Sequence, residues 1–120
     1  MVNPRNQLMT WLSDESEEMI GLLKDLLRAK SPNPPGDTRV AVEVVSSYLE
    51  KHDLDYRIIA PCDVMPNLVA SFDAPISGRH LVLNGHIDVF PVPADEYGWS
   101  SDPWAADERD KHIAPSLAIS

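Results

Sequence analysis

Apolar residues recur at helical spacing in two stretches near the start of the chain, and short β-forming runs follow them. The first helical pattern covers residues 14–29, and the second covers residues 37–52. Three strands are expected after the helices, at residues 56–60, 67–72 and 80–86. Two helices followed by three strands predict an α/β or α+β layer arrangement, of which we expect α/β, with both helices covering one sheet.

Each expected helix carries one apolar stripe at the i, i+3, i+4 spacing of core-facing residues. The stripes consist of Met19, Ile20, Leu23, Leu26 and Leu27 in the first helix, and of Ala41, Val44, Val45, Tyr48 and Leu49 in the second. Acidic residues crowd the start of the first helix, where unpaired backbone amides favour negative charge. We interpret them as a solvated face rather than a metal site. A proline-rich connector, residues 31–37, separates the two helices.

The polar residues of most interest follow the third expected strand. The apolar run at residues 81–83 leads through Asn84 and Gly85 to His86 and Asp88, before two prolines end the extended stretch. If the backbone stays extended, His86 and Asp88 lie on the same face. An imidazole beside a carboxylate suits a metal ligand or an acid–base histidine, and it also occurs as a structural hydrogen-bonded pair. The spacing alone leaves these interpretations open.

Composition argues against some classes of binding partner and of cellular location. The chain has 120 residues and a formal net charge of −9, which argues against nucleic acid because phosphate binding needs clustered Lys and Arg. No apolar window approaches the length of a membrane-spanning helix, and the first residues lack the apolar region of a signal peptide. The single cysteine, Cys62, cannot form an internal disulfide, so we expect a cytoplasmic, reducing location. Cys62 also lacks a basic neighbour in sequence, which argues against a catalytic thiol.

The sequence around His86 resembles a family signature. Residues 85–93 read Gly-His-Ile-Asp-Val-Phe-Pro-Val-Pro, and residues 98–104 read Gly-Trp-Ser-Ser-Asp-Pro-Trp. Both stretches resemble the co-catalytic zinc amidohydrolases and exopeptidases, the family that includes acetylornithine deacetylase, succinyl-diaminopimelate desuccinylase, aminoacylase, glutamate carboxypeptidase and the carnosine-type dipeptidases. Trp104 stands where the family usually has phenylalanine. Residues 31–38 are also similar to a family segment, and the resemblance covers about residues 15–113.

This resemblance implies a zinc site and a fold. By analogy His86 binds one zinc ion, and Asp88 holds the other ring nitrogen and thereby fixes the tautomer. The family binds two zinc ions that share a bridging aspartate and a water, and a glutamate acts as general base. Its substrates are N-acyl amino acids or short peptides. The implied structure is a partial zinc-exopeptidase-like fold, with two N-terminal helices packed on a mixed sheet.

The end of the chain departs from the family pattern. The bridging aspartate of the family lies in a later Gly-Arg-Gly-x-x-Asp-Met-Lys motif, and residues 111–120 contain neither that motif nor a carboxylate side chain. Asp107, Glu108 and Asp110 come too early and are expected in an exposed loop, and His112 is not expected to bind metal. We therefore expect residues 1–113 to form the N-terminal portion of a catalytic domain and residues 114–120 a divergent tail. The lid or dimerisation domain is expected to be absent.

These features predict a fragment of a zinc-dependent metallohydrolase that is inactive alone, because later metal ligands and the catalytic glutamate lie outside it. Its expected partners are a small-molecule substrate and the C-terminal half of the enzyme. Two alternatives stay open: a non-catalytic truncated isoform that binds a full-length relative, and a small independent domain that uses His86 and Asp88 without metal. A sheet cut after its first strands leaves an unpaired edge, so we also expect the isolated chain to be marginally stable.

Overall fold

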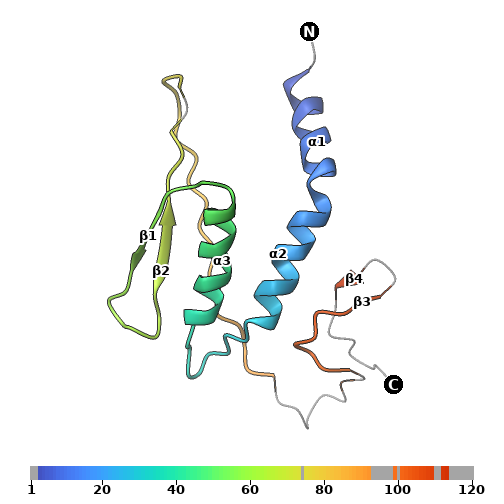
Figure 1. Ribbon diagram of the computed structural model, residues 1–120, viewed down its shortest axis with the longest axis vertical. Helices are drawn as coiled ribbons and strands as arrows, with labels where there is room; N and C mark the ends of the chain where they lie inside the picture. Colours follow the sequence, from blue (N-terminus) through green and yellow to red (C-terminus); the bar gives the residue numbers. More distant parts are fainter. Residues whose placement is uncertain (1–2, 74, 93–98, 100, 110–111, 114–120) are drawn as a thin grey trace.

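The computed structural model describes residues 3–73, 75–92, 99, 101–109 and 112–113 (Figure 1). Helices come first and strands follow, as the sequence pattern predicts, and the chain is of the α/β class. The elements are, in chain order, α1 (Pro4–Asp14), α2 (Ser16–Arg28), α3 (Arg39–Lys51), β1 (Tyr56–Ile59), β2 (Asn67–Ala70), β3 (Glu108–Arg109) and β4 (His112–Ile113).

α1 is a helix that the sequence pattern does not predict. It begins at Pro4, a favoured first helical residue, and the side-chain oxygen of Asn3 accepts the Arg5 backbone N–H at 2.9 Å. Figure 1 shows α1 and α2 following one another as two segments of one rod, with Glu15 between them. The helix expected from residue 14 therefore begins at Ser16, and another helix precedes it. No side chain of α1 is buried in the described structure.

The helices α2 and α3 lie side by side and cover each other in part (Figure 1). On α3 the predicted stripe is confirmed, because Ala41 and Leu49 are buried and the other three stripe residues are half-buried. On α2 the stripe is only partly covered, since Met19, Ile20 and Leu23 are 37–47% exposed. The buried apolar residues of the described structure are Ala29, Ala41, Val42, Leu49 and Ala106.

β1 and β2 form an antiparallel hairpin in which Tyr56 pairs with Ala70 and Ile59 pairs with Asn67. These strands confirm the predicted runs at residues 56–60 and 67–72, with slightly earlier ends. A hydrogen bond from the backbone N–H of residue 38 to the Val64 carbonyl (2.9 Å) ties the hairpin loop to the start of α3. β3 and β4 form a second, shorter antiparallel pair.

The third expected strand, at residues 80–86, is not formed. Leu81, Val82 and Leu83 belong to no strand in the described structure, and they are 79–85% exposed. A strand exists only where a neighbouring strand accepts and donates its backbone hydrogen bonds, and the hairpin does not pair with these residues. Both strand pairs among the described residues are antiparallel, so the expected mixed sheet stays a prediction.

The described structure is open. Its Cα radius of gyration is 17.6 Å, whereas a compact domain of this length has a value of about 14 Å. Large apolar side chains on α1, on α2 and at residues 81–83 face solvent. This exposure supports the expectation of marginal stability, which stays a prediction.

A substitution at Gly36 tests how much the turn in the connector between α2 and α3 contributes to stability. Its φ is +82°, and an added Cβ would lie 2.7 Å from the end of the Met65 side chain. The Met65 methyl can move, but the positive φ cannot relax without reshaping the turn. We expect Gly36→Ala to destabilise the fold by about 1 kcal/mol or more, read as a lower Tm in thermal unfolding followed by circular dichroism.

Gly21→Ala is the matched control, because Gly21 lies inside α2 and an added Cβ there would meet no atom within 4 Å. Alanine is favoured over glycine in a helix by up to about 1 kcal/mol, so this variant should be slightly more stable than the wild type. Equal Tm values for Gly36→Ala and the wild type would contradict the structural role given to the turn.

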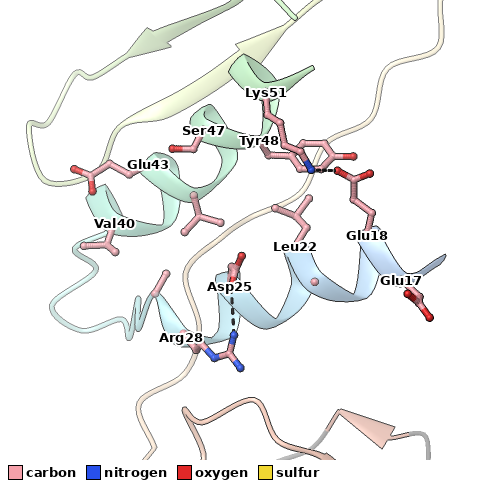
Figure 2. Close-up of a pocket in the computed structure, with 13 residues that line it drawn as sticks. Glu17, Glu18, Leu22, Asp25, Arg28, Val40, Glu43, Ser47, Tyr48 and Lys51 are labelled. Atoms are coloured by element: carbon pink, nitrogen blue, oxygen red, sulfur yellow. Dashed lines mark hydrogen bonds and ion pairs between the residues drawn. The ribbon is translucent and has the colours of Figure 1, made fainter. Parts of the chain in front are cut away.

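Glu18 links the two helices through its carboxylate. Glu18 Oε1 lies 2.6 Å from Lys51 Nζ and 2.9 Å from His52 Nε2, and Figure 2 draws the Lys51 contact. His52, the residue that follows α3, therefore also pairs with α2. Hydrogen bonds from Lys51 and His52 hold the pKa of Glu18 below its ordinary value.

A lowered pKa in the folded state means that the link stabilises fully above the ordinary glutamate pKa of 4.5. This stabilisation is lost as the pH falls through the lowered pKa. Glu18→Gln should thus lower the Tm at neutral pH, and the difference from the wild type should shrink on acidification. Glu17→Gln, one residue away and exposed, is the control and should change the Tm little at any pH. A constant difference across the pH series would count against this link.

Candidate functional site

The proline-rich connector holds the segment that carries Asp88. The Val89 backbone N–H donates to the Ser31 carbonyl at 3.0 Å, and the Asn33 backbone N–H donates to the Val89 carbonyl at 2.8 Å. These bonds form a short parallel bridge between Pro32 and Val89. The Ser31 hydroxyl, which is buried, donates to the carbonyl of Ile87. The connector therefore positions residues 87–89 although no sheet does.

His86 and Asp88 contact each other, as the two-residue spacing predicts. His86 Nδ1 lies 3.1 Å from Asp88 Oδ1 and 2.8 Å from the Asp88 carbonyl oxygen. Both partners are acceptors, so Nδ1 carries the proton and donates it. In this tautomer the lone pair of the neutral ring lies on Nε2, and the His86 side chain is 84% exposed. The arrangement presents one free imidazole nitrogen to solvent.

Asn33 completes a chain of three side chains. Its Nδ2 donates to Asp88 Oδ2 at 2.9 Å, while the other oxygen of Asp88 accepts from His86. The amide of Asn33 is the main reason that the pKa of the Asp88 carboxyl is lowered, and His86 adds a smaller effect. Asp88 thus stays ionised at neutral pH and keeps its acceptor for the histidine.

The acidic residues near the end of the described chain do not join this site. Glu108, in β3, pairs with Lys24 of α2 at 2.7 Å, and Asp107 is exposed as expected. The side chain of His112 and all of Asp110 lie outside the described residues. Within the part of the chain that the structure describes, no group of three or more His, Cys, Asp or Glu side chains could hold a metal ion.

The second sequence motif forms a local turn. The Trp104 backbone N–H donates to Asp102 Oδ1 at 3.0 Å, and the Ala105 N–H donates to the Asp102 carbonyl at 3.1 Å. The Ala105 carbonyl in turn accepts from Arg28 Nε of α2 at 3.2 Å. The motif therefore helps to dock this turn on α2. Gly98 and Ser100 lie outside the described residues.

An open groove of about 950 Å³ runs between α2 and α3, and Figure 2 shows its walls. Acidic side chains line it together with Leu22, Val40 and Tyr48. Neither His86 nor Asp88 contributes to the groove. It follows the incompletely covered contact of the two helices and is separate from the histidine site.

Sequence reasoning missed Asn33 and Ser31. The proline-rich segment that contains them is similar to a family segment, but no sequence pattern indicates its link to residues 87–89. A polar residue set between prolines in a short connector is the signal that was available, since such a rigid loop can hold a side chain in one place.

Comparison with known proteins finds relatives along most of the chain. The N-formyl-4-amino-5-aminomethyl-2-methylpyrimidine deformylase of Halalkalibacterium halodurans is 33% identical over 105 residues, covering 83% of this chain and 24% of that protein. Succinyl-diaminopimelate desuccinylase 2 of Ruegeria sp. is 30% identical over 105 residues, covering 88% and 26%. The desuccinylase of Sulfurimonas denitrificans is 35% identical over 94 residues, covering 78% and 23%. The chain belongs to this amidohydrolase family.

The chain spans about a quarter of the length of the family members that it matches. No family model matches it, and no solved structure is significantly similar to it. Among the described residues, no helix is both long enough and apolar enough to cross a membrane.

The contact between Asn33 and Asp88 gives a prediction that needs no enzymatic activity. Asn33→Ala should raise the pKa of Asp88 toward its ordinary value of 3.8, because the strongest hydrogen bond to the charged carboxylate is lost. The stabilisation from this contact is full above that ordinary pKa and disappears as the pH falls through the lowered one. An NMR titration of the Asp88 side chain measures the change.

The control for this titration is Asn84→Ala, because Asn84 is exposed and close in sequence to the site. It should leave the pKa of Asp88 where it is in the wild type. The pKa of Asp37, which Arg39 lowers, serves as an internal reference in every sample. An unchanged pKa of Asp88 in Asn33→Ala would show that the amide does not hold the carboxylate.

Proposed function

We propose that this chain supplies a zinc ligand, His86, and its orienting carboxylate, Asp88, to a zinc-dependent amidohydrolase. The enzyme is proposed to cleave amide bonds of N-acyl amino acids or short peptides. One observation carries the proposal: His86 Nδ1 is engaged by Asp88, while the exposed ring leaves Nε2 free to bind a ligand.

The donor atoms fit zinc. Zinc binds the neutral imidazole nitrogen of histidine, and metal-bound histidines donate their other N–H to a carboxylate or carbonyl. Both acceptor types belong to Asp88 here, at 3.1 Å and 2.8 Å from Nδ1. Asn33 adds support by keeping the carboxylate ionised and oriented. These residues hold the imidazole in one tautomer and one direction.

A catalytic zinc site takes about three protein ligands and one open position, and His86 accounts for one of the ligands. In our proposal, residues 1–113 are the N-terminal portion of the catalytic domain. Polypeptide that continues or pairs with this portion supplies the remaining ligands and the general base. When bound, zinc lowers the pKa of a water ligand from about 15.7 toward 7, which supplies the nucleophile. The chain by itself is proposed not to hydrolyse substrate.

The relatives support the substrate class. One is named a deformylase and two are named desuccinylases, so each name describes the removal of an acyl group. We extend this chemistry to the enzyme that contains the present chain, with a small N-acyl compound as its substrate. A cytoplasmic location is part of the same proposal and rests on the single exposed cysteine, Cys62.

A chimeric enzyme tests the proposal. The matching quarter of the Sulfurimonas denitrificans desuccinylase is replaced by this chain, and zinc content and desuccinylation are measured together. We expect a chimera that binds zinc and is active. His86→Ala should remove zinc and activity. Asp88→Asn should lower metal affinity or activity by about 10- to 100-fold, the usual cost of losing a partner of a metal-bound histidine.

His80→Ala is the matched control, because His80 is an exposed histidine only a few residues away. Circular dichroism of each variant separates loss of the site from loss of the fold. A folded His86→Ala chimera that keeps full zinc content and activity would show that His86 is not a ligand. An active isolated chain would contradict the proposal that the rest of the site comes from elsewhere.

A further inference from the structure

The helix α1 presents an apolar face that no described residue covers. Leu8, Met9, Trp11 and Leu12 are 43–58% exposed, although they are among the largest apolar side chains of the helix. α1 also precedes the residues that carry the family signature, so the proposed function gives this face no role. A contiguous group of exposed apolar side chains typically marks an interaction site.

Helical geometry places charges on the same face as the apolar residues. Successive residues turn by about 100° around the axis, so residues three and four apart are neighbours. Arg5 lies before the apolar residues of this face, and Glu15 lies after them. The face consists, in chain order, of Arg5, Leu8, Met9, Trp11, Leu12 and Glu15.

The chemistry of this face is symmetric about position 10. A two-fold axis at that position sets Leu8 opposite Leu12 of an antiparallel second copy, with Met9 and Trp11 on the two flanks of the contact. The same axis sets Arg5 opposite Glu15 at both ends of the contact. We propose that α1 is a self-association surface and that its occupant is α1 of a second copy of this chain, paired antiparallel. Such an isologous contact uses the same patch twice.

Charge selects this register over the alternatives. A parallel pair sets Arg5 against Arg5 and Glu15 against Glu15, so like charges face each other. A longer antiparallel overlap centred between α1 and α2 brings the acidic cluster, from Asp14 to Glu18, against its own copy. Like charges in such positions oppose association. A membrane surface is a poorer occupant, because Arg5 is the one basic residue of α1 and the chain carries a net charge of −9.

The size of the contact sets its strength. A helix of 11 residues is about 16 Å long, so two copies bury less surface than a standard stable interface. The pair is therefore a weak dimer with a Kd in the micromolar range. Trp11 and the two leucines supply most of the binding free energy, and the end charges set the orientation.

Sedimentation velocity of the full chain, across the micromolar range, tests the proposal. The wild type is expected to shift from monomer to dimer with rising concentration. Leu8→Asp should raise the Kd by at least about tenfold, because it sets a charge against Leu12 of the second copy. Leu83→Asp is the control: Leu83 is 85% exposed but lies far from α1 in sequence, and its substitution should leave the Kd unchanged.

Charge reversal tests the register without touching the apolar residues. Arg5→Glu and Glu15→Arg should each weaken self-association, and an equimolar mixture of the two variants should dimerise again. In the mixture, one copy is acidic at both positions 5 and 15, and the other copy is basic at both. The two end contacts of the mixed dimer therefore each join opposite charges.

Three results overturn the proposal. The first is a wild-type chain that stays monomeric throughout the concentration series. The second is self-association that Leu83→Asp abolishes and Leu8→Asp does not, which assigns the contact to residues 81–83. The third is a longer polypeptide that is monomeric and loses thermal stability with Leu8→Asp, which shows that the face of α1 packs against its own chain.

Discussion

The link between the connector and residues 87–89 is the contact on which the described structure depends. The connector joins the end of α2 to the start of α3, and its backbone also binds the segment that carries Asp88. A Gly36 N–H bond to the Pro32 carbonyl, at 2.8 Å, closes the turn within the connector. The connector therefore holds the helix pair and the histidine site together, although residues 80–86 belong to no strand.

Apolar surface is the second theme of the structure, and it is left exposed in two different ways. In the described structure residues 81–83 belong to no strand and expose three apolar side chains, which is the condition of a strand without its neighbour. In α1 the backbone hydrogen bonds run along the helix, so its face exposes side chains. The first surface needs a strand of the same sheet, whereas the second needs another helix face. This difference is why we propose a helical partner for the face of α1 and not for residues 81–83.

Ion pairs in the described structure join particular elements but contribute little to the free energy of folding. Glu18 joins α2 to α3, and Lys24 joins α2 to β3, but solvent-screened ion pairs of this kind contribute little to the free energy of folding. At the histidine site the same kind of interaction has a chemical use, because Asn33 and Asp88 together set the tautomer of His86. Arg5 is the one basic residue of α1, and Glu15 follows the other end of the helix. The proposed pair is therefore antiparallel, because that orientation sets Arg5 against Glu15.

Local patterns determined α2, α3, the hairpin and the contact of His86 with Asp88. Helical periodicity and strand alternation depend on residues a few positions apart, and two residues separated by one share a face wherever the backbone is extended. Tertiary structure alone decided the rest. Asn33 reaches Asp88 across 55 positions of sequence, which no local pattern encodes. Residues 81–83 have a strand-like composition, yet a strand needs a partner for its backbone hydrogen bonds, and only the three-dimensional arrangement shows whether that partner is present.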